Sequence, residues 1–478
     1  MKRLLSIVLL LLAACTSPSY PGIDNPPPVQ LDSDNQLIID YIDKRMYAEY
    51  YWLDEVVELG LSFNRSQKWE NYLPSMLAMM ETNADDGYVD AQGRRHFYSY
   101  IRELDKSTRA EGTTMGFGIG LYYVIASFES GDLGFIVDYV YKDSPAEKAG
   151  VCRGDIVTSV DGKKISRDNY LTLFNTIEQN MASSVQLDIM RQIYDDEQDA
   201  NLVTKLDIAP YNASPVLHSE VIELDGQPRI GYLVYRSFDR EYNKELISAL
   251  ADLSAQGVER MILDLRGNGG GAVESAIKLA SALLGSGYAG ELLCELRRNP
   301  LNEVNAESTF RYLEDVGVSL GIDHLTVICS EYTASASELV IEGLRGLDIP
   351  VTLVGSTTQG KNCGMDVTQR VVGNKFVEFA PITFMCYNAK GFGEYGEGLT
   401  PDIDITSDNK FGVKDELYPL PRCRWGDMNH DIALVAAVAE ITGKSISGGA
   451  KTRCAALPQL TKGVALTPPI EGTRLYEE

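Results

Sequence analysis

The sequence is short of positive charge, of zinc-type cysteine spacing and of long apolar runs. It has 43 lysines and arginines against 68 acidic residues, which gives a formal net charge of -25 over 478 residues. Nucleic-acid phosphates require a basic face, so this balance argues against nucleic acid as a partner. The eight cysteines lack zinc-site spacing, and we assign no metal. A chain of this length is expected to form about three domains.

The one notable apolar run, Leu4 to Ala14, follows Met-Lys-Arg and precedes Cys15. It is too short to span a bilayer, and with its basic start it predicts an export signal over residues 1–15. Leu12-Ala13-Ala14-Cys15 resembles a bacterial lipobox, which implies diacylation of the Cys15 thiol; an ordinary signal peptide is the alternative. Ser17, and not an Asp, lies two residues after Cys15. Under the usual enterobacterial sorting rule for lipoproteins, this favours the outer membrane, facing the periplasm. We therefore expect a lipid-anchored protein of the bacterial cell envelope.

Changes in composition divide the rest of the chain. Residues 16–33 are a Pro-rich tether without a hydrophobic pattern. In residues 34–111 apolar side chains recur at a helical period, which predicts a small N-terminal helical domain. Residues 206–440 alternate strands with helices, an arrangement that implies crossover units and a largely parallel sheet. Residues 441–478 form a C-terminal tail to which we assign no role.

Residues 112–205 read as short strands with a Ser144-Pro-Ala, Ala149-Gly and Gly154-Asp signature. This signature resembles the PDZ domain of bacterial peptidases. The resemblance implies that backbone N–H groups of Gly118-Ile119-Gly120-Leu121 hold the terminal carboxylate of a peptide. It also implies that Leu171 and Phe174 line the pocket for the terminal side chain. The alternative is that these glycines only shape a strand and that the domain gates an active site.

The stretch from Cys329 to Gly364 carries the strongest chemical signal. A buried strand at Leu325–Cys329 turns into an apolar-periodic helix beginning near Ala336, which leaves Ser335 at the strand-to-helix turn. Backbone N–H groups of a first helical turn favour developing negative charge. A second strand, Val351 to Val354, delivers Lys361 just past its end. A neutral lysine can take a serine proton, although each motif alone also reads as a helix cap or a surface turn.

Two glycine motifs suggest other functions. Gly355 to Lys361 matches the first seven positions of a phosphate-binding P-loop. Asn362 then replaces the hydroxyl that would bind magnesium, and a strand follows where a helix is required. Gly267 to Ala272 fits a dinucleotide fingerprint on spacing. A nicotinamide oxidoreductase would leave Ser335 and Lys361 unexplained.

Taken together, four motifs resemble the C-terminal processing (tail-specific) peptidases. They are Leu265-Arg-Gly-Asn-Gly-Gly-Gly, Thr333-Ala-Ser-Ala-Ser-Glu, Gly360-Lys and Gly398-Leu-Thr-Pro-Asp-Ile, in that order after the PDZ-like segment. The resemblance covers about residues 112 to 410. It implies a multidomain α/β protein with a crotonase-like α/β catalytic core, an inserted or preceding PDZ domain and the N-terminal helical domain.

The resemblance also implies roles for individual residues. Ser335 would be the nucleophile and Lys361 the general base, and backbone N–H groups of Gly270 and Ala336 would form the oxyanion hole. Glu338 matches a position that orients the lysine in some members. Other members use a Gln where this chain has Met365. The four histidines fit no place in this site, which argues against a Ser/His/Asp triad.

The sequence thus predicts an exported, lipid-anchored serine endopeptidase of the C-terminal processing type that needs no cofactor. It would bind C-terminal tails of proteins or peptides through the PDZ domain and cleave with a Ser/Lys dyad. A non-catalytic PDZ peptide-binding lipoprotein on the same scaffold is the alternative. Neither the physiological substrate nor the oligomeric state follows from the sequence. A hairpin turning at Asn374-Lys375 is also predicted, with Cys363 opposite Cys386.

Overall fold

The computed structural model describes residues 33–60, 63–89, 93–104, 114–122, 133–166, 168–191, 200–299, 309–405, 423–443 and 474–476. The predicted export signal, Cys15, almost all of the tether and most of the C-terminal tail lie outside these ranges. Within them, no helix has both the length and the apolar composition needed to cross a membrane.

The central element is a six-stranded sheet in the order β12-β13-β14-β17-β18-β22. Its strands run parallel except β12, which is antiparallel to β13. The bounds are β12 (Val216–Ile222), β13 (Ile230–Tyr235), β14 (Arg260–Asp264), β17 (Leu325–Cys329), β18 (Val351–Gly355) and β22 (Ile403–Asp404). The predicted strand at Leu325–Cys329 is confirmed. All parallel strands present their carboxyl ends at one edge, where loops can gather side chains.

Helices cover both faces of this sheet. On one face α6 (Asn243–Ala255), α7 (Val273–Leu284) and α8 (Ala336–Gly346) bury their apolar sides in a large common core. On the other face α9 (Ile432–Thr442) packs against Ile262, Ile328 and Val354. The sheet is therefore buried on both sides, which explains why its strands are continuous apolar runs rather than alternating ones.

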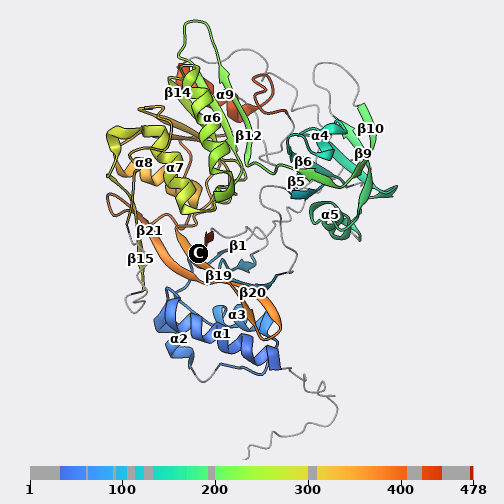
Figure 1. Ribbon diagram of the computed structural model, residues 1–478, viewed down its shortest axis with the longest axis vertical. Helices are drawn as coiled ribbons and strands as arrows, with labels where there is room; N and C mark the ends of the chain where they lie inside the picture. Colours follow the sequence, from blue (N-terminus) through green and yellow to red (C-terminus); the bar gives the residue numbers. More distant parts are fainter. Residues whose placement is uncertain are drawn as a thin grey trace, which may run out of the picture.

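The PDZ-like segment folds as a separate lobe (Figure 1). Its sheet has the order β10-β9-β7-β6-β5, with β8 on β7 and with β5 at the edge. The elements are β5 (Ile119–Tyr122), β6 (Phe135–Val140), α4 (Pro145–Lys148), β7 (Ile156–Val160), β8 (Lys163–Lys164), α5 (Tyr170–Glu178), β9 (Ser184–Arg191) and β10 (Ala200–Asp207). The short strands β4 (Thr114–Gly116) and β11 (Ala209–Tyr211) pair where the chain enters and leaves the lobe.

A second sheet has the order β16-β15-β21-β19-β20-β3, with β23 on β19. It contains β3 (Tyr100–Glu103), β15 (Leu292–Arg298), β16 (Thr309–Arg311), β19 (Cys363–Val372), β20 (Lys375–Ala380), β21 (Ile382–Asn388) and β23 (Arg474–Tyr476). The α1 (Ser33–Glu49), α2 (Leu53–Leu59) and α3 (Trp69–Leu77) helices lie below β19 and β20 in Figure 1. A small hairpin of β1 (Tyr88–Val89) and β2 (Arg95–His96) follows them.

The N-terminal segment differs from the separate helical domain that we predicted for residues 34–111. Its helices form a single core with the second sheet, in which Ile42 and Tyr72 belong to the same cluster of buried side chains as Phe379. In addition, β3 is hydrogen-bonded to β20. The apolar stripe of α1 is thus covered by strands from a segment more than 300 residues away, a partner that helical periodicity cannot identify.

The predicted cysteine pairing is wrong by one residue. The hairpin turns at Gly373-Asn374, with Val372 opposite Lys375. An irregularity between Gly364 and Met365 then shifts the pairing with β21, so Cys363 faces Met385 rather than Cys386. A bulge of this kind changes which side chains meet and leaves little trace in the hydrophobic pattern.

Candidate active site

Ser335 lies at the N-cap of α8, beside the carboxyl ends of β14 and β17. It has φ 60° and ψ -112°, an uncommon conformation for a residue with a side chain. Hydrogen bonds to the neighbouring segment fix the turn before it: the Thr333 hydroxyl donates to Leu265 O (2.8 Å), and Ala334 N donates to Asn268 O (3.0 Å). The main chain therefore holds Ser335 in place at the edge of the sheet.

Lys361 follows β18 and is only 1% exposed, which rules out the surface turn considered above. Its Nζ has no hydrogen-bond partner among the described residues and lies 4.6 Å from the ring centroid of Tyr98. Burial lowers the pKa of Lys361 below the usual range for lysine, while nearby Cys363, Asp86 and Glu338 oppose that shift. Because a buried charge without hydrogen bonds is costly, this environment favours the neutral amine.

Glu338 connects the two residues. Its side chain is completely buried, so it is not a surface helix carboxylate. Oε2 accepts from Ser335 N (2.8 Å) and from Lys361 N (2.9 Å), and Oε1 accepts from the Thr358 hydroxyl (2.6 Å) and from Gly360 N (2.8 Å). Burial raises the pKa of Glu338 to about 7, against the effect of these hydrogen bonds. One carboxylate thus binds the backbone of both Ser335 and Lys361, and it contacts Lys361 through the main chain rather than the amine.

The glycine-rich loop after β14 approaches Ser335 closely. Gly270 has φ +100°, and a Cβ there would lie 2.8 Å from Ser335 Cβ and 2.9 Å from Ala336 N. Only glycine fits this position without displacing the serine turn. The predicted oxyanion donors are therefore neighbours, since Ala336 is the first residue of α8. The N–H of Gly270, however, donates to Asn268 Oδ1 (2.9 Å) in this structure.

A buried ion-pair cluster that we did not predict supports the same loop. Arg266 binds Asp264 at the end of β14 and Asp431 at the start of α9, each with a closest contact of 2.6 Å. All three side chains are buried. The sequence Asp264-Leu265-Arg266 at the end of β14 is a local pattern consistent with the Arg266–Asp264 pair. Asp431 is 165 residues further along the chain, and no local pattern identifies it.

The predicted peptide-binding residues of the PDZ lobe differ in their exposure and in the contacts that they make. Gly118 has φ +71° and contacts Ser144 so closely that a Cβ would lie 2.2 Å from Ser144 Cβ. The N–H of Leu121 donates to the carboxylate of Glu178. Phe174 is buried, with its ring 5.6 Å from that of Phe135, whereas Leu171 is 55% exposed. The structure thus places Phe174 in the core of the lobe and leaves Leu171 on its surface.

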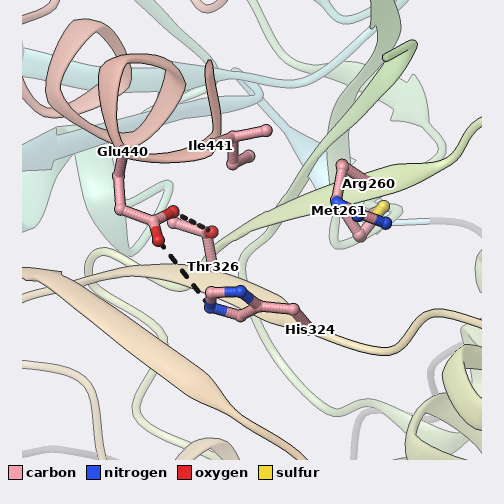
Figure 2. A pocket seen from close by; sticks show the side chains of 6 residues that line it. All are labelled: Arg260, Met261, His324, Thr326, Glu440 and Ile441. Atoms are coloured by element: carbon pink, nitrogen blue, oxygen red, sulfur yellow. Dashed lines mark hydrogen bonds and ion pairs between the residues drawn. The ribbon is translucent and has the colours of Figure 1, made fainter. Parts of the chain in front are cut away.

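A cavity of about 240 Å³ lies elsewhere, at the amino ends of β14 and β17 (Figure 2). Three of its polar side chains already bind one another: Thr326 Oγ1 donates to Glu440 (2.9 Å), and the His324 ring lies 3.8 Å from the same carboxylate. Ser335 and Lys361 are at the opposite edge of the sheet. We therefore place the candidate active site at the carboxyl edge and assign nothing to this cavity.

Comparisons with known proteins identify relatives of both lobes. Residues 229–405 match peptidase family S41, and residues 136–189 match the PDZ domain. A probable CtpA-like serine protease of Staphylococcus epidermidis is 25% identical over 268 residues, which cover 56% of this chain and 49% of the relative. Its counterpart in Staphylococcus aureus strain COL is 22% identical over 312 residues, covering 65% and 57%. The chain spans about half the length of these curated relatives.

A solved structure of an S41 protease from Bacteroides fragilis NCTC 9343 has a TM-score of 0.66 at 22% identity, and the match covers 84% of this chain and 97% of that one. At this identity the likeness concerns the fold. The two domain matches fall on the two lobes that carry the residues described above, and the S41 match includes Ser335, Glu338 and Lys361. The chain therefore combines a domain that matches peptidase family S41 with a PDZ domain, and it is similar to probable CtpA-like serine proteases.

Proposed function

We propose that the protein is a serine endopeptidase in which Ser335 is the nucleophile and Lys361 the general base. The observation that carries the proposal is the Glu338 carboxylate, which binds the backbone N–H groups of both residues inside a buried site. A neutral amine at Lys361 can accept the Ser335 hydroxyl proton as the oxygen attacks a peptide carbonyl. That proton then passes to the departing amine. Water, deprotonated by the same lysine, attacks the resulting ester, releases the acyl product and restores the serine.

The oxyanion formed during each attack needs hydrogen-bond donors. Ala336 N–H belongs to the first turn of α8, and Gly270 N–H lies beside it. In a working enzyme Gly270 N–H would have to exchange Asn268 Oδ1 for the substrate oxygen. Losing one donor of this kind typically costs about 3 to 4 kcal/mol of transition-state stabilisation. Closure of this loop on substrate is therefore part of the proposed mechanism.

We also propose that the PDZ lobe binds C-terminal tails. The strand β5 ends the order of its sheet, so an extended peptide could pair with it as an additional strand. The backbone of Gly118-Ile119-Gly120-Leu121 would meet the terminal carboxylate, and exposed Leu171 would contact the terminal side chain. Substrates would accordingly be proteins or peptides with an accessible C-terminus.

Lipidation of Cys15 and a position in the cell envelope, facing the periplasm, belong to the same proposal. They rest on the Leu-Ala-Ala-Cys pattern alone. Metabolic labelling with a fatty acid should mark the wild-type protein and not Cys15→Ser. An unlabelled wild-type protein would argue for an ordinary signal peptide.

Cleavage of an unfolded protein tests the catalytic proposal. The purified enzyme should degrade it, and Ser335→Ala and Lys361→Ala should not, while both variants remain folded and still bind peptide. A non-catalytic peptide-binding protein would bind equally well and leave the substrate intact in all three forms. Undiminished cleavage by Ser335→Ala would remove that residue from the role of nucleophile.

A further inference from the structure

The amine of Lys361 is enclosed partly by the N-terminal segment. Tyr98, in the connection between β2 and β3, is 6% exposed, and its ring centroid lies 4.6 Å from Nζ. A cation within about 6 Å of the face of an aromatic ring is attracted by the ring quadrupole, more strongly where water is excluded. Within the described ranges no side chain offers Nζ a hydrogen bond, so the contact with the ring is not replaced by a stronger polar one.

Hydrogen bonds fix the backbone around Tyr98. The buried Asp86 carboxylate accepts from Ser99 N (2.8 Å), from the Ser99 hydroxyl (2.6 Å) and from the Tyr50 hydroxyl (2.8 Å). In turn, Ser99 Oγ accepts from Ile382 N of β21 (2.8 Å). These hydrogen bonds connect Ser99, the residue after Tyr98, to the C-terminal end of α1 and to the second sheet. They restrict movement of the Tyr98 ring away from Lys361.

The surroundings of Lys361 determine how strongly the Tyr98 ring affects protonation of the amine. Met365, four residues after Lys361, is completely buried and is a thioether, which is only a weak hydrogen-bond acceptor. Burial lowers the pKa of Lys361, and this shift is opposed by the titratable groups around the amine, which are Cys363, Asp86, Glu338 and Cys386. An aromatic face acts in the same direction as Asp86, because it attracts the ammonium and not the neutral amine. Removing the ring should therefore make the amine lose its proton at lower pH.

We propose that Tyr98 is a positioning residue for Lys361, whose ring holds the amine in the site and, by favouring its charged form, sets the pH at which the enzyme starts to work. This inference rests on the proposed Ser/Lys mechanism. It assigns to the N-terminal segment an indirect part in catalysis, through Lys361, beyond supporting the second sheet. The effect is assigned to the aromatic face of Tyr98, while its hydroxyl is hydrogen-bonded to Gln359.

The test is the dependence of kcat/KM on pH for cleavage of an unfolded peptide, because this profile reports ionisations of the free enzyme. Loss of the ring in Tyr98→Leu should lower the midpoint of the rising limb by about one pH unit. The matched control Tyr98→Phe keeps the ring and should retain the wild-type midpoint. A merely structural role would reduce activity at every pH without moving the midpoint.

A second series keeps the inference testable if Tyr98→Leu does not fold. Phenylalanine analogues with increasing ring fluorination at position 98 retain the shape of the ring while weakening its attraction for a cation. The midpoint should fall progressively along the series. A constant or rising midpoint in either series would overturn the inference. If the wild-type protein instead fails to cleave in a Ser335-dependent way, the proposed function fails first, and the two failures are distinct.

Discussion

Glu178 accepts a hydrogen bond from a backbone N–H group that the proposed peptide site requires. Its carboxylate, at the end of α5, accepts from Leu121 N–H, one of the groups expected to hold a terminal carboxylate. Burial raises the pKa of Glu178 to about 7, the Leu121 N–H and Arg236 oppose this, and Asp138 adds to it. Above pH 7 the side chain is therefore mainly charged, competes with an incoming C-terminus for the same donor and repels it. Below pH 7 the competing charge is lost.

The Glu178→Gln substitution removes this charge and keeps the size of the side chain and an oxygen that can accept. A charge-assisted hydrogen bond is worth about 1.5 to 3 kcal/mol, so a ligand carboxylate that no longer competes should bind roughly 10-fold more tightly. The gain should appear at pH 8 and shrink toward pH 6, where Glu178 in the unsubstituted protein is already protonated. A peptide amidated at its C-terminus should gain little at either pH.

Fluorescence anisotropy with the free and the amidated form of one peptide measures these effects, in a Ser335→Ala background that prevents cleavage. Asp168→Asn is the matched control, since it removes a carboxylate from an exposed position of the same lobe. That control should leave both affinities unchanged. Equal effects of Glu178→Gln on the two peptides, or weaker binding of the free form, would refute carboxylate capture by this loop.

Three further substitutions test the catalytic edge. Lys361→Arg should be as inactive as Lys361→Ala in peptide cleavage, because guanidinium stays protonated, whereas wild-type activity should rise through mildly alkaline pH as the lysine loses its proton; appreciable activity of the Arg variant would remove the lysine from its role. Gly270→Ala should abolish cleavage because its Cβ would meet the Ser335 turn, while Gly226→Ala, with φ +67° and open space around it, carries similar backbone strain and should keep full activity. Glu338→Gln replaces an oxygen that accepts two hydrogen bonds by a donor, so kcat should fall at least 10-fold with a lower thermal midpoint; unchanged kcat would show that this carboxylate does not organise the site.

The sequence predicted those parts of the fold that local patterns encode. The strand Leu325–Cys329, the turn at Ser335 and the helix from Ala336 all follow from short apolar runs and a change of period, and each is observed. The short strands of the PDZ lobe, such as β5, follow from the same kind of signal. Ser335 and Lys361 could be located at the ends of such elements, whereas the roles expected for Gly270, Ala336 and Glu338 came from the resemblance to the C-terminal processing peptidases.

The features that the sequence could not predict depend on contacts between distant segments. Whether Glu338 lies on the surface or inside is decided by donors from Thr358 and Gly360, and nothing in the period of α8 indicates them. The contact of Tyr98 with Lys361 joins two segments that share no motif. The hydrogen bond from Leu121 to Glu178 changes the expected peptide site, and it depends on the packing of α5 against β5.

The central claim is that Lys361 activates Ser335, and the formation of a covalent adduct tests it most directly. A fluorophosphonate reacts with a serine whose hydroxyl proton is removed by a nearby base, without any need for a peptide substrate. Incubation at pH 8 followed by mass spectrometry should find a single adduct on Ser335 in the wild-type protein. A folded Lys361→Ala variant should carry almost none. Labelling of Ser335 at an unchanged rate in that variant, or an adduct on another residue, would contradict the account.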